Sequence, residues 1–491
     1  MRKTALLISL CFGFAELAQA VTVSVKPGDP VATLTSELGA GDQVVFTDGT
    51  YVLEEGLVWG GTGTQDQPIT LKAQNPGMAV LQLVAGSYVA EIVDGTWIQV
   101  EGLIFEGSAD YLEQSYGGLR VRTTEGLLSS NIIVQDCEIR NVGGSGLRVD
   151  GDASSLTIER NHIHDTGNGT GINIGTNDAS YWLMDSVIAQ NQVHQIGGDY
   201  AYGIYLANGS QGNIIRDNVV YGISYRGMFV GSTESGAANE ILGNIIWQAN
   251  DTGLWLEGAA VVQNNVIFDI EGDGIRSNND DAREGLDNQI ISHNTVVNTT
   301  DDAVQLSDWF FRSGMVFANN VVANPTGYGF DFDDDYTEYD TTTNYIANNV
   351  VTGLVDGYDP ALYPGWVLPG AGFADFVDVE NWDFYPSSTA LTINSGDASA
   401  EAWVPVADFN GAPRDGAAPD VGAYEWDGDG NPGWTVQEGF KELGFDGTGD
   451  SHDVGSGGCC GGGKKDGESD GGEALFFLPL LSLGWLRRRR A

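Results

Sequence analysis

The residues best suited to chemistry recur at a fixed place in a repeated segment that usually begins with Gly. The segment reads GIYL at Gly203, GMFV at Gly227 and GLWL at Gly253, and it continues as GIRS, AVQL and GFDF. Aliphatic residues alternate with others in each copy, so the third residue points away from the aliphatic ones. These third residues form one column: Tyr205, Phe229, Trp255, Arg276, Gln305 and Asp331.

Flat aromatic side chains beside hydrogen-bonding groups are suited to binding a sugar chain. The next outward position along the same segments adds small and polar residues to this surface. The alternative interpretation is a cross-strand aromatic stack that only stabilises the sheet. The residues expected to bind substrate are Tyr205, Phe229, Trp255, Glu257, Asn278 and Gln305.

Acid–base chemistry would belong to the polar end of the same column. Glycoside hydrolysis requires two carboxyl groups about 5–9.5 Å apart. Asp331 and Asp333 share one side of a strand and are separated by roughly 7 Å along it. With Arg276 as the electrostatic group, the candidate catalytic residues are Asp331, Asp333 and Arg276.

Cations suited to β-elimination on a uronate are scarce. No Lys lies between Lys72 and Lys441. Arg148 and Arg276 are five repeats apart, which corresponds to roughly 24 Å at the spacing of stacked strands. This scarcity favours a protein that binds polysaccharide without strong catalysis. The alternative is a carbohydrate-active enzyme, namely a polysaccharide lyase, a hydrolase or a uronate epimerase.

Two further groups have the chemistry of metal ligands. His164 and His194 occupy one position in successive repeats, but the adjacent repeats have Arg140 and Tyr221 there. A stack of rings is therefore favoured over a metal site. The segment DGDGNPGWTVQE has the ligand spacing of an EF-hand calcium loop, with Pro432 at the sixth position in place of Gly. The predicted calcium ligands are Asp427, Asp429, Asn431 and Glu438, and no other cofactor is expected.

A second repeat indicates how these residues are positioned. Asn recurs in segments such as DNVV, GNII and ANNVV at intervals of 21 to 30 residues, and this period is typical of a solenoid. Alternating strands with Val and Ile on one side stack as a parallel β-helix. A buried amide needs hydrogen-bond partners, which an asparagine ladder between coils would provide. The ladder positions are Asn161, Asn191, Asn218, Asn244, Asn265, Asn294, Asn320 and Asn349, with Cys137 in the same slot.

An apolar stripe lies beside each Asn bend and must be covered. It comprises Val219, Ile245, Val266, Val321 and Val350. We expect segment 355–405, or a neighbouring chain, to cover it.

The repeats, together with GDQVVFTDGTY, PITLKAQNP and DFNGAPRDGAAPDVGAYEW, resemble the right-handed parallel β-helix superfamily with the pectin-lyase-like fold. The resemblance covers roughly residues 40–426 and implies an all-β, single-stranded right-handed parallel β-helix with an asparagine ladder. This fold carries lyases, hydrolases, epimerases and proteins of no known chemistry. YGFDFD also resembles the YGFDPH motif of mannuronan C5-epimerases at Tyr328 and Asp331, with Asp333 in place of His.

The termini indicate export. MRKTALLISLCFGFAELAQA is typical of a secretory signal peptide cleaved after Ala20. Near the other end, a 13-residue apolar run is too short for a spanning helix of roughly 20 residues and precedes four arginines. With Cys459–Cys460, this tail resembles MYXO-CTERM and GlyGly-CTERM sorting tags, which implies tag-processing machinery and a surface location. We expect export through the Sec route and membrane contact only through the tail.

Composition limits the partners. The net charge is −46, from 68 acidic and 22 basic residues, so nucleic acid is not expected to bind. Polyanionic sugars would be repelled as well, unless bound calcium bridges the charges. The four cysteines do not form a disulfide framework. A polysaccharide is therefore the expected partner.

The chain is predicted to divide into six parts. They are the signal peptide 1–20, the N-terminal cap and first coils 21–110, the β-helix repeats 111–354, the C-terminal coils and closing segment 355–426, the acidic Gly/Asp-rich linker 427–458 and the sorting tail 459–491.

Overall fold

The structure is a computed structural model. It describes residues 20–31, 38–107, 117–176, 180–233, 236–278, 286–309, 312–332, 342–357, 359–397, 403–414, 418–428 and 430–442. The predicted signal peptide up to residue 19, the tail 459–491, Asp333 and Asp429 lie outside these ranges. No helix within the described ranges is long and apolar enough to cross a membrane.

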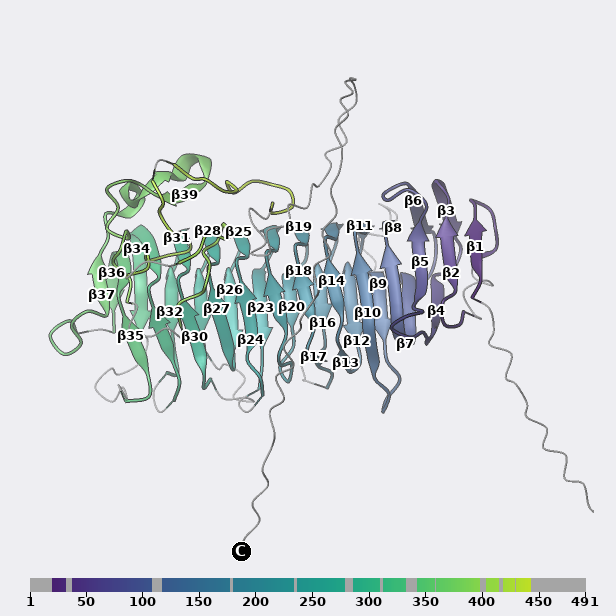
Figure 1. The fold of residues 1–491 in the computed structure, drawn as a ribbon, viewed down its shortest axis with the longest axis horizontal. Helices are drawn as coiled ribbons and strands as arrows, with labels where there is room; N and C mark the ends of the chain where they lie inside the picture. The colour runs from purple at the N-terminus through teal and green to yellow at the C-terminus, as the bar shows by residue number, and fades with distance from the viewer. Residues whose placement is uncertain are drawn as a thin grey trace, which may run out of the picture. The chain divides into compact units, whose positions relative to one another are not determined.

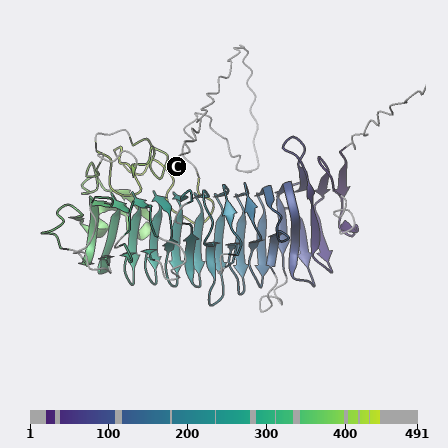
Figure 2. The ribbon, with the colours of Figure 1, turned by 90° about the horizontal axis from the view of Figure 1, so that it is seen from below.

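The described residues form a single-stranded parallel β-helix in which each coil contributes three short runs of strand (Figure 1). Each run pairs in parallel with its counterpart in the next coil, and the view turned by 90° shows the same stacking (Figure 2). We name the three resulting stacks the Gly-led stack, the Asn-led stack and the third stack. Strands β7, β34 and β36 are long and bend, so each of them belongs to two stacks.

The Gly-led stack carries the column of candidate residues. Its strands pair in the order β4 (Leu57–Thr62), β7 (Tyr88–Glu101), β9 (Gly117–Arg122), β12 (Leu147–Asp150), β16 (Ile172–Ile174), β20 (Tyr202–Leu206), β23 (Arg226–Gly231), β26 (Leu254–Glu257), β29 (Ile275–Ser277), β32 (Val304–Leu306), β34 (Val321–Phe332) and β36 (Asn349–Asp356).

The Asn-led stack follows the asparagine bends. Its strands are β3 (Gly49–Leu53), β6 (Ala79–Leu83), β8 (Leu103–Glu106), β11 (Glu138–Val142), β15 (His162–Thr166), β19 (Gln192–Ile196), β22 (Val219–Ile223), β25 (Ile245–Ala249), β28 (Val266–Ile270), β31 (Thr295–Thr299), β34, β36 and β37 (Val367–Pro369).

The third stack precedes the bends. Its strands are β1 (Thr22–Val25), β2 (Gln43–Phe46), β5 (Ile69–Ala73), β7, β10 (Ser129–Gln135), β13 (Ala153–Ser154), β14 (Thr157–Glu159), β17 (Leu183–Met184), β18 (Val187–Ala189), β21 (Ile214–Arg216), β24 (Asn239–Leu242), β27 (Ala260–Gln263), β30 (Gln289–Ser292), β33 (Val316–Ala318) and β35 (Tyr345–Ala347).

The predicted asparagine ladder is present at the bends. From Asn161 to Asn320, each side-chain Nδ2 donates a hydrogen bond of 2.9–3.0 Å to the Oδ1 of the Asn in the next coil, and Asn349 is the last acceptor. The residue before each ladder Asn has a positive φ of 51–60°, which turns the chain into the bend. The sequence did not predict a second ladder, in which Asn213 donates to Asn239 over 2.9 Å.

Two apolar cores hold the coils together. One fills the lumen with the alternating aliphatic residues of all three stacks. The other lies outside the Asn-led stack, where residues between Phe376 and Val436 pack over the apolar stripe. This cover includes β38 (Phe376–Asp378), β39 (Asp383–Pro386) and the 3-10 turn η5 (Val379–Asn381), and η4 (Gly372–Asp375) leads into it. It extends past the predicted segment 355–405, because Tyr424, Trp434 and Val436 also take part.

Candidate functional site

The strand register places the candidate residues in one column, as the alternation predicted. Tyr205 pairs with Phe229, Phe229 with Trp255, and Trp255 with Arg276. The column continues to Gln305 and Asp331. Six coils therefore present one side chain each at the same height of the Gly-led stack.

The three aromatic side chains of the column pack against one another. The rings of Tyr205 and Phe229 stack with centroids 5.0 Å apart, and those of Phe229 and Trp255 lie 6.3 Å apart at a tilt. The residues are only 4–7% exposed, and Tyr202 packs on the group. Little of the ring surface is therefore accessible, and sugar binding here stays a prediction.

Two guanidinium groups lie on the Trp255 ring. The Cζ atom of Arg226 is 3.6 Å from the ring centroid and that of Arg276 is 4.7 Å from it. Arg226 also forms an ion pair with Asp251 at 3.2 Å, and Arg276 forms one with Asp273 at 3.5 Å. We call these five residues the Trp255 cluster.

Asp273 is the most perturbed acid of the Trp255 cluster. Its Oδ1 accepts a hydrogen bond from the Asp302 backbone N–H at 3.2 Å, and its Oδ2 faces Arg276. Burial raises the pKa of Asp273 from 3.8 to about 6, against the opposing effect of Arg276. A carboxyl group with a pKa near 6 can both accept and return a proton at neutral pH.

Arg276 has one donor without a partner in the part of the chain that the structure describes. Its Nε is buried and has no hydrogen-bond partner among the described residues, while its side chain is 28% exposed. Buried donors are nearly always paired in folded proteins. The Nε1 of Trp255 is also buried and unpaired within the described ranges, so two donors of the Trp255 cluster are unsatisfied there.

Sequence reasoning missed Arg226 and Asp273, because they lie one position before the Gly-led segment. The sequence does contain a signal for them, because the residue immediately before each Gly-led segment also recurs from coil to coil. Backbone hydrogen bonds align its members across the stack: Tyr202, Arg226, Thr252, Asp273, Asp302 and Tyr328.

Arg148 and Arg276 are five strands apart in the Gly-led stack, as predicted, but each has an arginine neighbour that the sequence prediction did not include. Arg148 is paired in register with Arg120, and one carboxylate, Asp150, bridges them at 2.6 and 2.7 Å. Arg276 has Arg226 on the same indole ring. Both partners were overlooked because the comparison covered only the outward positions of recognised repeats.

The remaining predicted site residues are in the following positions. Asp331 is half-buried, two coils beyond Arg276 in the same column, while its predicted partner Asp333 lies outside the described residues. Glu257 is 5% exposed and accepts a hydrogen bond from Asn208 at 3.0 Å. Asn278 is 4% exposed. The catalytic role of Asp331, Asp333 and Arg276 stays a prediction.

The predicted calcium loop makes contacts within the protein. The Oδ1 of Asp427 accepts a hydrogen bond from the Tyr385 hydroxyl at 2.9 Å. The Oδ1 of Asn431 accepts from Asn410 and from the backbone of Gly433, both at 3.0 Å. Asp429 is outside the described residues, so calcium binding stays a prediction.

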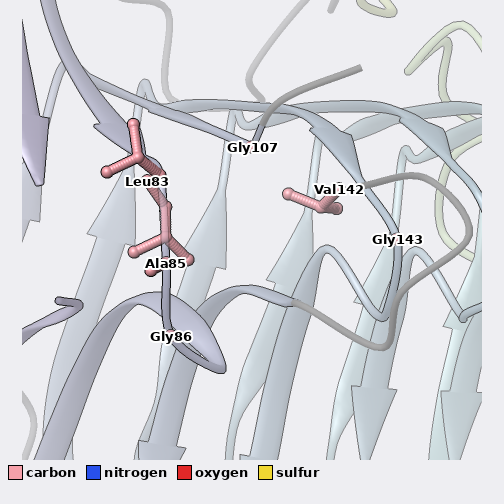
Figure 3. Close-up of a pocket in the computed structure, with 7 residues that line it drawn as sticks. Leu83, Ala85, Gly86, Gly107, Val142 and Gly143 are labelled. Carbon is pink, nitrogen blue, oxygen red and sulfur yellow. The ribbon is translucent and has the colours of Figure 1, made fainter. Parts of the chain in front are cut away.

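The predicted stack of rings runs along the Asn-led stack. His164, His194, Tyr221, Trp247 and Phe268 lie face to face, with interplanar angles of 4–11° between neighbours. The small pocket of Figure 3 lies at another place, where Leu83, Ala85 and Gly86 approach Val142 and Gly143. Its lining is almost entirely apolar and offers no group for catalysis.

Fold and register define the class of the protein as a right-handed parallel β-helix. Residues 171–351 match the family described as "Right handed beta helix region". No curated protein matches the chain.

Solved structures with the same fold include polysaccharide-modifying enzymes. The A-module of the Azotobacter vinelandii mannuronan C-5 epimerase AlgE4 is 18% identical, with a TM-score of 0.52, over 65% of this chain and 90% of that one. The A-module of AlgE6 from the same organism is 15% identical, with a TM-score of 0.50, over 65% and 88%. At these identities the similarity establishes the fold.

Proposed function

We propose that the chain is a carbohydrate-active enzyme that acts on a polysaccharide containing uronic acid, bound along the Gly-led stack. The observation that carries the proposal is the Trp255 cluster, where two guanidinium groups lie on one indole ring and one of them, that of Arg276, pairs with the Asp273 carboxyl. The shared fold with mannuronan C-5 epimerases supports it. This proposal favours the enzyme over the non-catalytic binding protein that the sequence suggested.

Each group has a role in removing the C5 proton of a uronate. Arginine binds carboxylates through charge-assisted hydrogen bonds, so Arg276 and Arg226 would neutralise the sugar carboxylate. Neutralisation acidifies the C5–H bond, and the Asp273 carboxylate would accept the proton. The electron pair left on C5 can form a C4–C5 double bond as the C4–O bond breaks; the glycosidic oxygen leaves with that bond's electron pair and takes a proton from water or from the protonated Asp273, which is lyase chemistry. If a proton is returned to the opposite face of C5 instead, the sugar is epimerised.

The net charge of −46 is the strongest physical argument against a polyanionic substrate. Within the cluster this repulsion is reduced, because two arginines offset Asp251 and Asp273. At ionic strengths near physiological, salt largely screens the repulsion between charges that are more than about 8–10 Å apart. Substrate binding should therefore tolerate salt better than binding to a basic protein would.

The experiment is an activity screen of the purified full chain on alginate, pectate and neutral glucans, with and without calcium. Unsaturated products are followed by ultraviolet absorbance, C5 inversion by NMR, and hydrolysis by new reducing ends. Asp273→Asn should lower kcat/KM by about 10²–10⁴-fold. Arg160→Ala is the matched control, because Arg160 is an ion-paired surface arginine on the other side of the coil. Turnover of neutral glucans alone, or full activity of Asp273→Asn, would overturn the proposal.

We further propose that the protein is exported through the Sec route and directed to the cell surface, and that calcium binds at Asp427, Asp429, Asn431 and Glu438. The signal-peptide pattern and the tail support export, and the ligand spacing supports calcium. Mass spectrometry of protein from the producing cell tests export. A mature chain that begins at Val21 is expected, and retention of residues 1–20 would contradict it.

A further inference from the structure

Three histidines converge on the outer face of the Asn-led stack, away from the Trp255 cluster. One ring nitrogen from each of His162, His164 and His194 lies within 4.8 Å of one from each of the others. His162 and His164 are two residues apart on β15, and His194 on β19 pairs in register with His164. The sequence comparison missed His162, because it considered only the column of His164 and its neighbours.

The closest approach joins His162 and His194. Their Nε2 atoms are 2.7 Å apart while the ring centroids are 5.0 Å apart, so the two nitrogens point at each other. Only one of the two facing nitrogens can carry a hydrogen, and the other presents a lone pair. Burial lowers the pKa of both imidazoles to about 4, so both are neutral near pH 7. Neutral imidazole is the form that binds metals.

The surroundings of His164 resemble those of a metal ligand. Its Nδ1 lies 2.8 Å from the Asp165 carboxylate and its Nε2 lies 3.3 Å from Glu138, and against the effect of burial these carboxylates raise the pKa of His164, so a metal ion would have to displace the proton on Nε2. A carboxylate that holds the second ring nitrogen orients a histidine for a metal and increases its basicity. Glu138 contacts only His164 among the three rings.

The local charge favours a cation. The carboxylates of Glu106, Glu138 and Asp165 surround the group, whereas Arg140 is the guanidinium beside it. Arg140 is held at 2.6 Å by both Glu106 and Glu138, so its charge is already compensated. A divalent ion would therefore enter a site of negative net charge.

We propose that His162, His164 and His194 form a binding site for a divalent first-row transition metal ion, with Zn²⁺ or Cu²⁺ preferred over Ca²⁺ and Mg²⁺. Imidazole suits Zn²⁺ and Cu²⁺, whereas Ca²⁺ and Mg²⁺ require oxygen ligands. Zn–N bonds of about 2.0–2.1 Å require the two facing nitrogens to move apart by roughly 1 Å. Rotation of the side chains, which are only partly buried, allows this movement. Three protein ligands leave a fourth position for water.

The test uses the full chain and Co²⁺ as a spectroscopic probe, followed by competition with Zn²⁺. The tail contains other ligands, so the reference protein carries H452Q, C459S and C460S. This reference should bind one Co²⁺ without a thiolate charge-transfer band, and Zn²⁺ should displace it. His162→Gln or His194→Gln should abolish binding, and Asp165→Asn should weaken it about 10–100-fold.

Folding of the variants is checked by circular dichroism, and Zn²⁺ should raise the Tm of the reference protein but not that of His194→Gln. Asp165 is at the surface, so its variant reports on the site even if a histidine variant unfolds. A reference protein that binds no metal, or a folded His194→Gln variant that binds as tightly as the reference, would overturn the proposal.

Discussion

The outer faces of the Asn-led and Gly-led stacks come from the same repeats, yet their side chains have different neighbours. On the Asn-led face, Tyr221, Trp247 and Phe268 stack almost in parallel and are covered by residues between Phe376 and Val436. On the Gly-led face, Tyr205 and Phe229 stack and Trp255 packs at a tilt against Phe229, but charged side chains adjoin the Trp255 ring.

The two tryptophans make the contrast clear. Trp247 is 0% exposed and Trp255 is 4% exposed, so burial does not distinguish them. Trp247 packs with Trp382 and other apolar side chains, whereas Trp255 carries the guanidinium groups of Arg226 and Arg276. The repeat determines the direction of a side chain. The residues around that side chain determine whether it contributes to stability or to chemistry.

The largest effect is expected for stability on the covered face. Trp247→Ala should lower the free energy of unfolding by about 3–5 kcal/mol, because it opens a cavity between the sheet and its cover. Trp255→Ala should cost less stability, because water can replace the ring beside the two arginines, but it should abolish activity. Urea unfolding followed by circular dichroism measures both. Equal losses of stability would contradict the contrast between the two faces.

The fold was predictable because every coil has the same requirement, a hydrogen-bond partner for its buried Asn amide, and the sequence therefore repeats. The Asn at each bend satisfies its amide through the next coil, and eight positions, from Asn161 to Asn349, showed the period. The second ladder at Asn213 and Asn239 is too short to show a period.

The candidate site was predictable only in part. Alternation within a strand placed Tyr205, Trp255 and Arg276 correctly in one column. Arg226 and Asp273 lie where the chain enters the strand, and there the direction of a side chain depends on turn geometry rather than on alternation. His162 escaped notice because its contact with His194 runs diagonally between strands.

The asparagine ladder should contribute a smaller but clear amount of stability. Asn244→Ala removes an acceptor of the Asn218 side chain and backbone, and it also removes the donor to Asn265. Each buried group left unpaired costs about 1–3 kcal/mol. Asn75→Ala is the control, since Asn75 is exposed and bonds only to Asp48 through its side chain. If both variants unfold at the same urea concentration, the ladder has no stabilising role.

The last effect expected is a pH dependence of activity and stability that arises from Asp273. It should show that the Gly-led face is the reactive one. If the carboxylate is the base, kcat/KM should fall about tenfold per pH unit below a pKa of about 6 and level off above it.

The folded-state pKa of Asp273 is raised, so the unfolded chain loses this proton at a lower pH than the folded chain does. Stability should therefore decline as pH rises from about 4 to about 6 and then remain constant. Burial also raises the pKa values of Asp408, Asp420 and Glu425, so Asp273→Asn should make this decline shallower rather than remove it, whereas Trp247→Ala on the other face should leave the contribution of Asp273 in place. An activity profile that does not change between pH 5 and pH 7 would require another base, and the half-buried Asp331 in the same column would be the next candidate to replace.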